Sequence, residues 1–132
     1  MATRIESPPM EHRSKCPIAS TLDLVGDRWT LLVLRNIFRG SRRYGEHLES
    51  PEGIATNILA DRLALLEREG LIEKVAYQTR PLRHEYRLTR KGADLLPVLQ
   101  TLATWSMKHV PDRWAPSERF MHSRPEDFLA QD

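Results

Sequence analysis

The segment that follows the turn Ser50-Pro51-Glu52-Gly53 carries small and hydrogen-bonding side chains that could contact the edges of DNA bases. The side-chain amide of Asn57 can donate one hydrogen bond and accept another, the pattern that recognises adenine in the major groove. Thr56 adds a hydroxyl. If residues 55–69 form a helix, its small and polar residues share one slim arc. The candidate contact residues of this helix are Ala55, Thr56, Asn57, Ala60, Asp61 and Arg68. An ordinary solvated helix face explains any single member equally well, but basic segments bracket the set.

Basic side chains are gathered in two segments. Five arginines and no acid occur between residues 28 and 44, and residues 77–91 hold four arginines and one lysine against the single acid Glu85. A net charge of only +2 is weak support for a nucleic-acid partner, but this clustering is typical of a face that meets a polyanion. The candidate phosphate-contacting residues are Arg42, Arg43, Tyr44, Thr79, Arg80 and Arg83. For the last three, a basic solvated loop is the simpler alternative.

Cys16 is the single cysteine of the chain and cannot form an internal disulfide. Pro17 suits the first position of a helix, so that Cys16 would cap it where the helix dipole stabilises a thiolate. Lys15 and Arg13 would add positive potential. Cys16 is therefore a candidate sensor of an oxidant or a small-molecule electrophile, although a small, inert cysteine at a subunit contact accounts for it as well.

The other reactive side chains show no catalytic or metal-binding pattern. Glycine-rich phosphate loops, a nucleophile elbow and paired carboxylates are absent from the sequence, so we expect neither an enzyme nor a cofactor. The histidines lack metal-ligand spacing, and we expect no metal at His12, His47, His84, His109 or His122. No apolar run approaches the ~20 residues that cross a bilayer, and residues 1–15 lack the apolar core of a signal peptide. We expect no membrane partner and a cytoplasmic location.

Apolar spacing and capping residues predict the elements that would position these side chains. The expected order is helices over 17–25, 28–38, 44–48 and 55–69, strands over 71–77 and 84–88, and a last helix over 90–109. Residues 78–83 should form a loop longer than a tight hairpin turn. Thr89 should cap the last helix, and Pro97 should kink or break it. Arg62 falls inside the apolar arc of the fourth helix. Its guanidinium must therefore form an ion pair or extend past the core into solvent, and Glu46 is the expected partner.

This order predicts a winged helix-turn-helix, a mainly α fold with a small β-hairpin as its wing. The third and fourth helices would form the helix-turn-helix. We expect a flexible arm over residues 1–14, the winged helix-turn-helix domain over 15–110, and a polar, weakly structured tail over 111–132.

Apolar residues at both ends of the domain exceed what its core needs, which indicates a second chain. The candidate dimer-interface residues are Ile18, Leu22, Val25, Leu95, Leu99, Leu102 and Trp105. We expect a homodimer through the N- and C-terminal helices. Two recognition helices ~34–36 Å apart would then read a palindromic operator.

Several runs of the sequence resemble the HxlR family of bacterial regulators. They are Cys16-Pro17-Ile18, Gly26-Asp27-Arg28-Trp29, Arg43-Tyr44-Gly45-Glu46-His47-Leu48, Gly53-Ile54-Ala55, Leu66-Glu67-Arg68-Glu69-Gly70-Leu71-Ile72 and Leu88-Thr89-Arg90-Lys91-Gly92. The resemblance covers about residues 14 to 110, and the Gly-Asp-Arg-Trp run is its more specific part. It implies a homodimer built from the first and last helices that binds a two-fold symmetric operator. It also implies a cysteine at the position of Cys16, which some members use to sense electrophiles or oxidants.

The predicted function is sequence-specific binding of double-stranded DNA by a transcriptional regulator. We expect a repressor, because a short single domain offers no segment for recruiting polymerase. The alternative is a winged helix that only docks other proteins. Salt dependence distinguishes the two, since DNA binding releases counterions and weakens steeply with salt.

Overall fold

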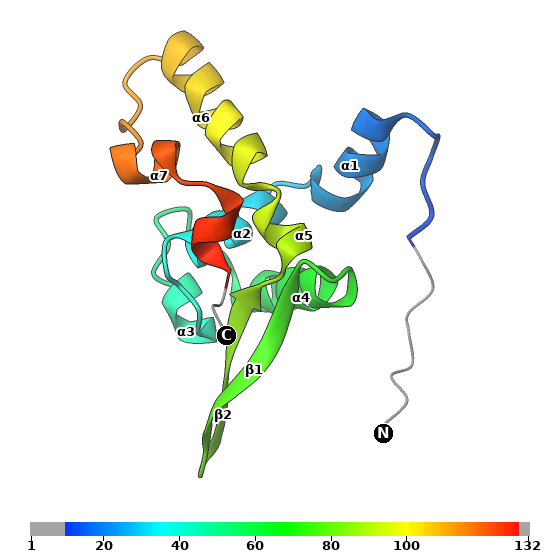
Figure 1. The fold of residues 1–132 in the computed structure, drawn as a ribbon, viewed down its shortest axis with the longest axis vertical. Helices are drawn as coiled ribbons and strands as arrows, with labels where there is room; N and C mark the ends of the chain where they lie inside the picture. Colours follow the sequence, from blue (N-terminus) through cyan, green and yellow to red (C-terminus); the bar gives the residue numbers. More distant parts are fainter. Residues whose placement is uncertain (1–9, 130–132) are drawn as a thin grey trace.

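The computed structural model describes residues 10–129, a mostly helical chain with one β-hairpin (Figure 1). In chain order the elements are α1 (Pro17–Val25), α2 (Thr30–Phe38), α3 (Tyr44–His47), α4 (Thr56–Arg68), β1 (Ile72–Thr79), β2 (Leu82–Leu88), α5 (Arg90–Ala93), α6 (Leu96–His109), α7 (Glu118–His122) and the 3-10 helix η1 (Pro125–Phe128). Of the arm expected over residues 1–14, residues 1–9 lie outside the described part. Within residues 10–129, no helix is long and apolar enough to cross a membrane.

The core forms where α2 and α4 pack against each other and against the start of the hairpin. Leu59, Leu63 and Leu66 repeat at the spacing of one helix face, and all three are buried. Leu34 of α2 and Leu96 of α6 are completely inaccessible to solvent in the same cluster. Burying each such leucine stabilises the fold by about 1.5–3 kcal/mol. The apolar face of α4 is thereby fixed, and its opposite face remains at the surface.

Two predicted capping side chains bond backbone amides at helix starts, although α2 begins at Thr30, two residues later than predicted. The Asp27 carboxylate accepts from the backbone N–H groups of Trp29 and Thr30, at 2.9 and 3.0 Å, where α2 begins. The Thr89 hydroxyl oxygen accepts from the Gly92 N–H at 3.2 Å. Pro97 lies in the first turn of α6, so the last helix is broken into α5 and α6, as the proline predicts.

The hairpin is longer than predicted, and its connecting loop is shorter. β1 and β2 pair antiparallel from Ile72 opposite Leu88 to Thr79 opposite Leu82, with an irregularity between residues 76 and 78. Only Arg80 and Pro81 connect the strands, so the expectation of a long loop over residues 78–83 was wrong. Residues 78, 79 and 83 are polar, and a two-stranded wing is solvated on both faces. The alternation of apolar and polar residues that predicts a strand is therefore missing at this end of the hairpin.

The C-terminal segment corrects a second expectation. Residues 117–129 are structured: they form α7 and η1, and Phe120 and Phe128 pack against the core. The Phe128 ring meets the Phe38 ring edge-on with centroids 4.9 Å apart. The side-chain amide of Gln100 in α6 donates to backbone carbonyls of α7 and the turn after it. A weakly structured tail is therefore wrong for this segment, because two aromatic residues anchor a stretch that is polar on average.

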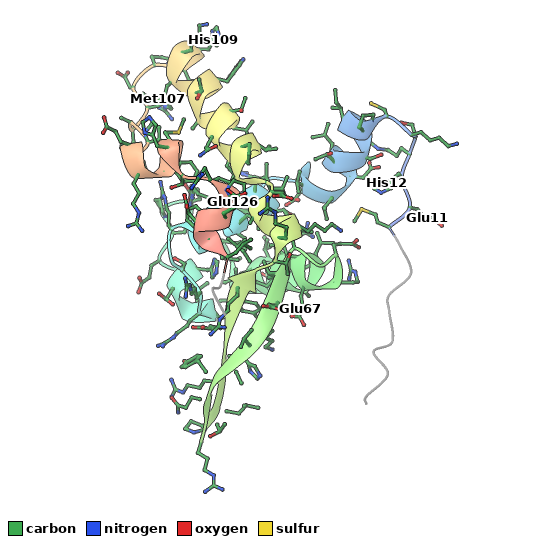
Figure 2. The ribbon with its side chains drawn as sticks, in the orientation of Figure 1. Glu11, His12, Glu67, Met107, His109 and Glu126 are labelled. Carbon is green, nitrogen blue, oxygen red and sulfur yellow. The ribbon has the colours of Figure 1, made fainter. Side chains whose placement is uncertain are left out.

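An ion pair adds to this docking. Arg90 of α5 pairs with Glu126 of η1 at 2.9 Å, and Figure 2 labels Glu126 near the middle of the molecule. The Glu126 carboxylate accepts a hydrogen bond from Arg90, and this bond lowers the pKa of Glu126 below its ordinary value. The C-terminal segment thus returns from the far end of α6 to the body of the fold (Figure 1).

Helix α1 is set apart from the other helices in Figure 1 and exposes much of its apolar side. Ile18 and Leu22 are 72% and 52% exposed, and Leu102 and Trp105 of α6 are 51% and 61% exposed. Two other residues predicted at a subunit interface are already covered. Val25 and Leu99 are buried within the single chain, so little of either side chain is exposed to a second one. Leu95 is half-buried against the core.

Candidate nucleic-acid interface

Helix α4 presents the predicted recognition residues to solvent. Its buried face is apolar, and the exposed residues of the opposite face and the N-cap are Ala55, Thr56, Asn57, Ala60, Asp61, Ala64 and Arg68. Ala55, the N-cap, has no side-chain acceptor for the first amides of the helix. Uncapped amides at a helix N-terminus suit a phosphate oxygen. The structure therefore brings together a slim polar face and a set of free amide donors at one helix end.

Tyr44 links the two helices of the helix-turn-helix. Its hydroxyl donates to the backbone carbonyl of Thr56 at 2.8 Å, which ties the start of α3 to the start of α4. Tyr44 is a predicted phosphate contact, but in the free chain its hydroxyl proton is already donated to Thr56. Tyr44 instead positions the residues that lead α4.

Arg42 and Arg43 lie between the helix-turn-helix and the hairpin. The Arg43 guanidinium lies over the Tyr77 ring of β1, 4.2 Å from its centroid, a cation–π contact. The Tyr86 N–H of β2 donates to the Arg42 carbonyl at 2.7 Å. The approach to α3 is thus fastened to both strands, and the wing cannot move independently of α3 without breaking these contacts.

The predicted wing residues lie at the hairpin tip. Thr79, Arg80 and Arg83 are exposed there, and Figure 1 shows the hairpin extending away from the helices. Among residues 10–129, neither these two arginines nor Arg42 and Arg43 take part in an ion pair. Unpaired guanidinium groups attract phosphates more strongly than paired ones, because no neighbouring carboxylate offsets their charge.

Arg62 pairs with acids other than the one predicted. Its guanidinium contacts Asp27 at 3.5 Å and also bonds the adjacent Asp61. Glu46, the expected partner, instead accepts from the Arg43 backbone N–H at 3.0 Å at the start of α3. The prediction of a structural ion pair holds, but its partner was wrong because the cap of α2 lies within reach of α4.

These contacts shape the charge of the recognition face. Burial opposes ionisation of Asp27, but hydrogen bonds from residues 29 and 30 outweigh it and lower the pKa of this carboxyl. The bond to Arg62 partly neutralises Asp61. Arg68, at the far end of the face, lies 3.8 Å from the carboxylate of Glu69.

A network around Arg35 was not predicted from the sequence. Its guanidinium binds both carboxylate oxygens of Glu52, at 2.6 and 2.9 Å, and the Ser50 hydroxyl at 3.1 Å. The hydrogen bond from Arg35 lowers the pKa of Glu52 to about 2. The turn before α4 is thereby held against α2. Arginine and glutamate 17 positions apart carry no local signal of such a pair.

Cys16 occupies the N-cap of α1 and is exposed. Pro17 holds the first helical position, as predicted. Arg13, which was expected to add positive potential, is paired with Asp23 at 2.5 Å, and His12 binds the same carboxylate at 3.2 Å. The positive charge of Arg13 is therefore offset by a neighbour on α1.

His47 is buried within α3, which its sequence context did not predict. Within the described part of the chain, neither ring nitrogen has a hydrogen-bond partner. Burial lowers the pKa of its imidazole, and the nearby charge of Glu46 offsets only part of that effect. No group of three or more metal-ligating side chains lies together in residues 10–129.

Comparisons with known proteins bear on the fold and the class of protein. A family model described as HxlR-like helix-turn-helix matches residues 24–113. The chain is 41% identical over 105 residues to a helix-turn-helix-type transcriptional regulator of Mycobacterium tuberculosis. That alignment covers 80% of this chain and 66% of the relative, so the match spans slightly less than two thirds of the relative's length.

Two solved structures show the same arrangement. PA1607, a candidate transcription factor, is 38% identical with a TM-score of 0.70, covering 77% of this chain and 72% of that one. The redox regulator HypR in its oxidised form is 29% identical with a TM-score of 0.62, covering 71% of this chain and 97% of that one. The order of helices and hairpin is that of a winged helix-turn-helix.

Proposed function

Because the chain belongs to the HxlR-like helix-turn-helix family of transcriptional regulators, we propose that it binds a specific DNA sequence and regulates transcription from it. One observation carries the proposal: the exposed face of α4 is flanked by exposed arginines before α3 and at the hairpin tip. In this proposal α4 enters the major groove. Asn57 and Thr56 contact bases, and Arg42, Arg43, Arg80 and Arg83 contact phosphates.

The proposed DNA-binding form is a homodimer. The exposed apolar residues Ile18, Leu22, Leu102 and Trp105 support it, because apolar side chains this exposed favour burial against a second surface. A two-fold axis would place two α4 helices on a palindromic operator. We propose repression, in which the bound dimer occupies DNA that polymerase needs. The site of action is the cytoplasm, and the proposal includes no catalytic step.

A mobility-shift titration tests DNA binding. The probe is the duplex immediately upstream of the coding gene, and the competitor is a shuffled duplex of the same composition. We expect a shift that the competitor does not abolish and an affinity that falls steeply with salt, since several phosphates are neutralised. Failure to shift any duplex in dilute buffer would contradict the proposal and favour the alternative, a winged helix that only docks proteins.

We further propose that Cys16 responds to an oxidant or electrophile. Its exposure and its place at the N-terminus of α1 support a sulfur that reagents can reach, and the similar protein HypR is a redox regulator. Diamide or a quinone should change the DNA affinity of the wild type and leave Cys16→Ser unchanged. Equal responses in the two proteins would refute a sensing role.

A further inference from the structure

A cavity of about 640 Å³ lies beneath the C-terminal segment, on the body of the fold. Its walls come from the end of α2, the end of β2, and residues 117–129. Residues 117–129 follow the segment that matches the family model, which ends at residue 113. The volume falls within the range of about 300–1,000 Å³ typical of small-molecule sites.

The lining is cationic. Arg39, Arg42, Arg87 and Arg119 contribute to it, and its acidic residue is Asp127. Arg87 pairs with Glu85 at 2.8 Å, whereas no ion pair in the described part of the chain engages the other three arginines. Asp127 accepts from the Arg124 backbone N–H at 2.8 Å. Several unpaired guanidinium groups in the wall of one cavity favour an anionic ligand.

The same cavity has an aromatic side. Phe38, Phe120 and Phe128 are among the lining residues, and the Phe38 and Phe128 rings meet edge-on with centroids 4.9 Å apart. Aromatic walls favour a flat apolar group through burial and ring contacts. A free phosphate would make no use of the aromatic wall, and a neutral hydrocarbon would leave the arginines without a counter-charge.

We propose that this cavity binds a small aromatic carboxylic acid, with its carboxylate on the unpaired arginines and its ring against the phenylalanines. The site also reaches the DNA-binding surface, because Arg42 lines it and is bonded through its carbonyl to Tyr86 of the wing. A carboxylate on Arg42 competes with a phosphate for the same guanidinium. Ligand therefore weakens DNA binding, and this second step rests on the proposed function.

The first experiment measures binding without DNA. Isothermal titration of the full chain with 1-naphthoate should give saturable heat, and the uncharged 1-naphthamide should bind at least about tenfold more weakly, since it lacks the charge-assisted bonds. Arg39→Ala and Arg119→Ala should each weaken 1-naphthoate by about tenfold or more. Arg113→Ala is the matched control, because Arg113 is exposed and outside the cavity, and it should change nothing. Circular dichroism confirms that each variant is folded.

The second experiment measures coupling. Saturating 1-naphthoate should weaken the wild type's affinity for its duplex, sodium acetate at the same concentration should not, and Arg119→Ala should not respond. No heat with 1-naphthoate from a protein that still binds DNA overturns the inference and leaves the proposed function standing. Saturable, arginine-dependent heat from a protein that binds no DNA supports the cavity site and overturns the proposed function. Equal affinity for the acid and the amide overturns the assignment of an anionic ligand.

Discussion

Asn57 and Arg80 are exposed side chains that the proposed complex uses in different ways. Asn57→Ala should relax preference at one base position, at a cost of about 1–3 kcal/mol, because a bidentate base contact is lost. Arg80→Ala should weaken binding to all duplexes alike and reduce the salt dependence. Fluorescence anisotropy with the operator and its single-base variants measures both effects.

Arg113→Ala again serves as the control and should match the wild type on every duplex. A change in base preference from Arg80→Ala, with none from Asn57→Ala, would reverse the two roles assigned to these residues.

Glu52 makes stability depend on pH at the acidic end. Its pKa in the folded chain is about 2 against an ordinary value of 4.5, so its stabilising effect is complete above pH 4.5 and is lost as the pH falls towards 2. Because Glu52 is partly exposed, solvent screening limits the effect to about 1 kcal/mol. Over this window the free energy of unfolding of the wild type should fall by that much more than that of Glu52→Gln.

Urea titrations at several pH values measure this difference. Glu49→Gln is the matched control, because Glu49 is exposed and takes part in no ion pair within residues 10–129. Parallel curves for the wild type and Glu52→Gln would show that the bond to Arg35 contributes nothing to stability.

At the scale of elements, α5 packs directly against the chain that connects α4 to β1. A Cβ atom on Gly92 would lie 2.0 Å from the backbone oxygen of Leu71, and the Thr89 N–H donates to the same oxygen at 3.1 Å. Gly92→Ala should therefore destabilise the fold by about 3 kcal/mol or more, since backbone must move.

Gly45→Ala is the matched control for this substitution. Gly45 lies in α3 with nothing within 4 Å of an added Cβ, so alanine should be neutral or stabilising by up to about 1 kcal/mol. Thermal unfolding of both variants distinguishes them. A Gly92→Ala protein as stable as the wild type would show that α5 is not held this closely.

The elements that depend on local rules could be predicted from the sequence. Asp27 and Thr89 cap helices and Pro97 breaks one, because each acts on its immediate neighbours in the chain. The contacts of Phe120 and Phe128 with the core could not be predicted, since they join segments far apart in the sequence. The partner of Arg62 was missed for the same reason.

The exposed face of α4 could be predicted in the same way, because the spacing of its leucines determines which side faces the core. The role of Tyr44 could not, since a hydroxyl that bonds a carbonyl twelve residues away looks in the sequence like any exposed tyrosine. The cavity is formed by three separate segments and has no signature in any one of them.

At the scale of the whole molecule, assembly is the central prediction. Leu102→Glu should convert a dimer to a monomer, because a charge would replace an exposed apolar side chain at the proposed contact. Leu82→Glu, at the hairpin tip, where the leucine is 63% exposed, should not change the mass measured by sedimentation equilibrium.

Loss of the dimer should also weaken operator binding by about 100-fold, since the two half-sites are then bound independently. A wild-type protein that sediments as a monomer at all concentrations would refute the dimer, and a dimeric Leu102→Glu would place the contact elsewhere.

The exposure of the tryptophans gives the protein an intrinsic optical signal. Trp105 is 61% exposed at the proposed subunit contact, Trp114 is 83% exposed, and Trp29 is half-buried. If a partner chain covers Trp105, its emission will move to shorter wavelength on association and return to longer wavelength on dilution. Comparison of the wild type with Trp105→Phe isolates that indole, so that the dissociation constant between subunits can be read from fluorescence without an attached dye.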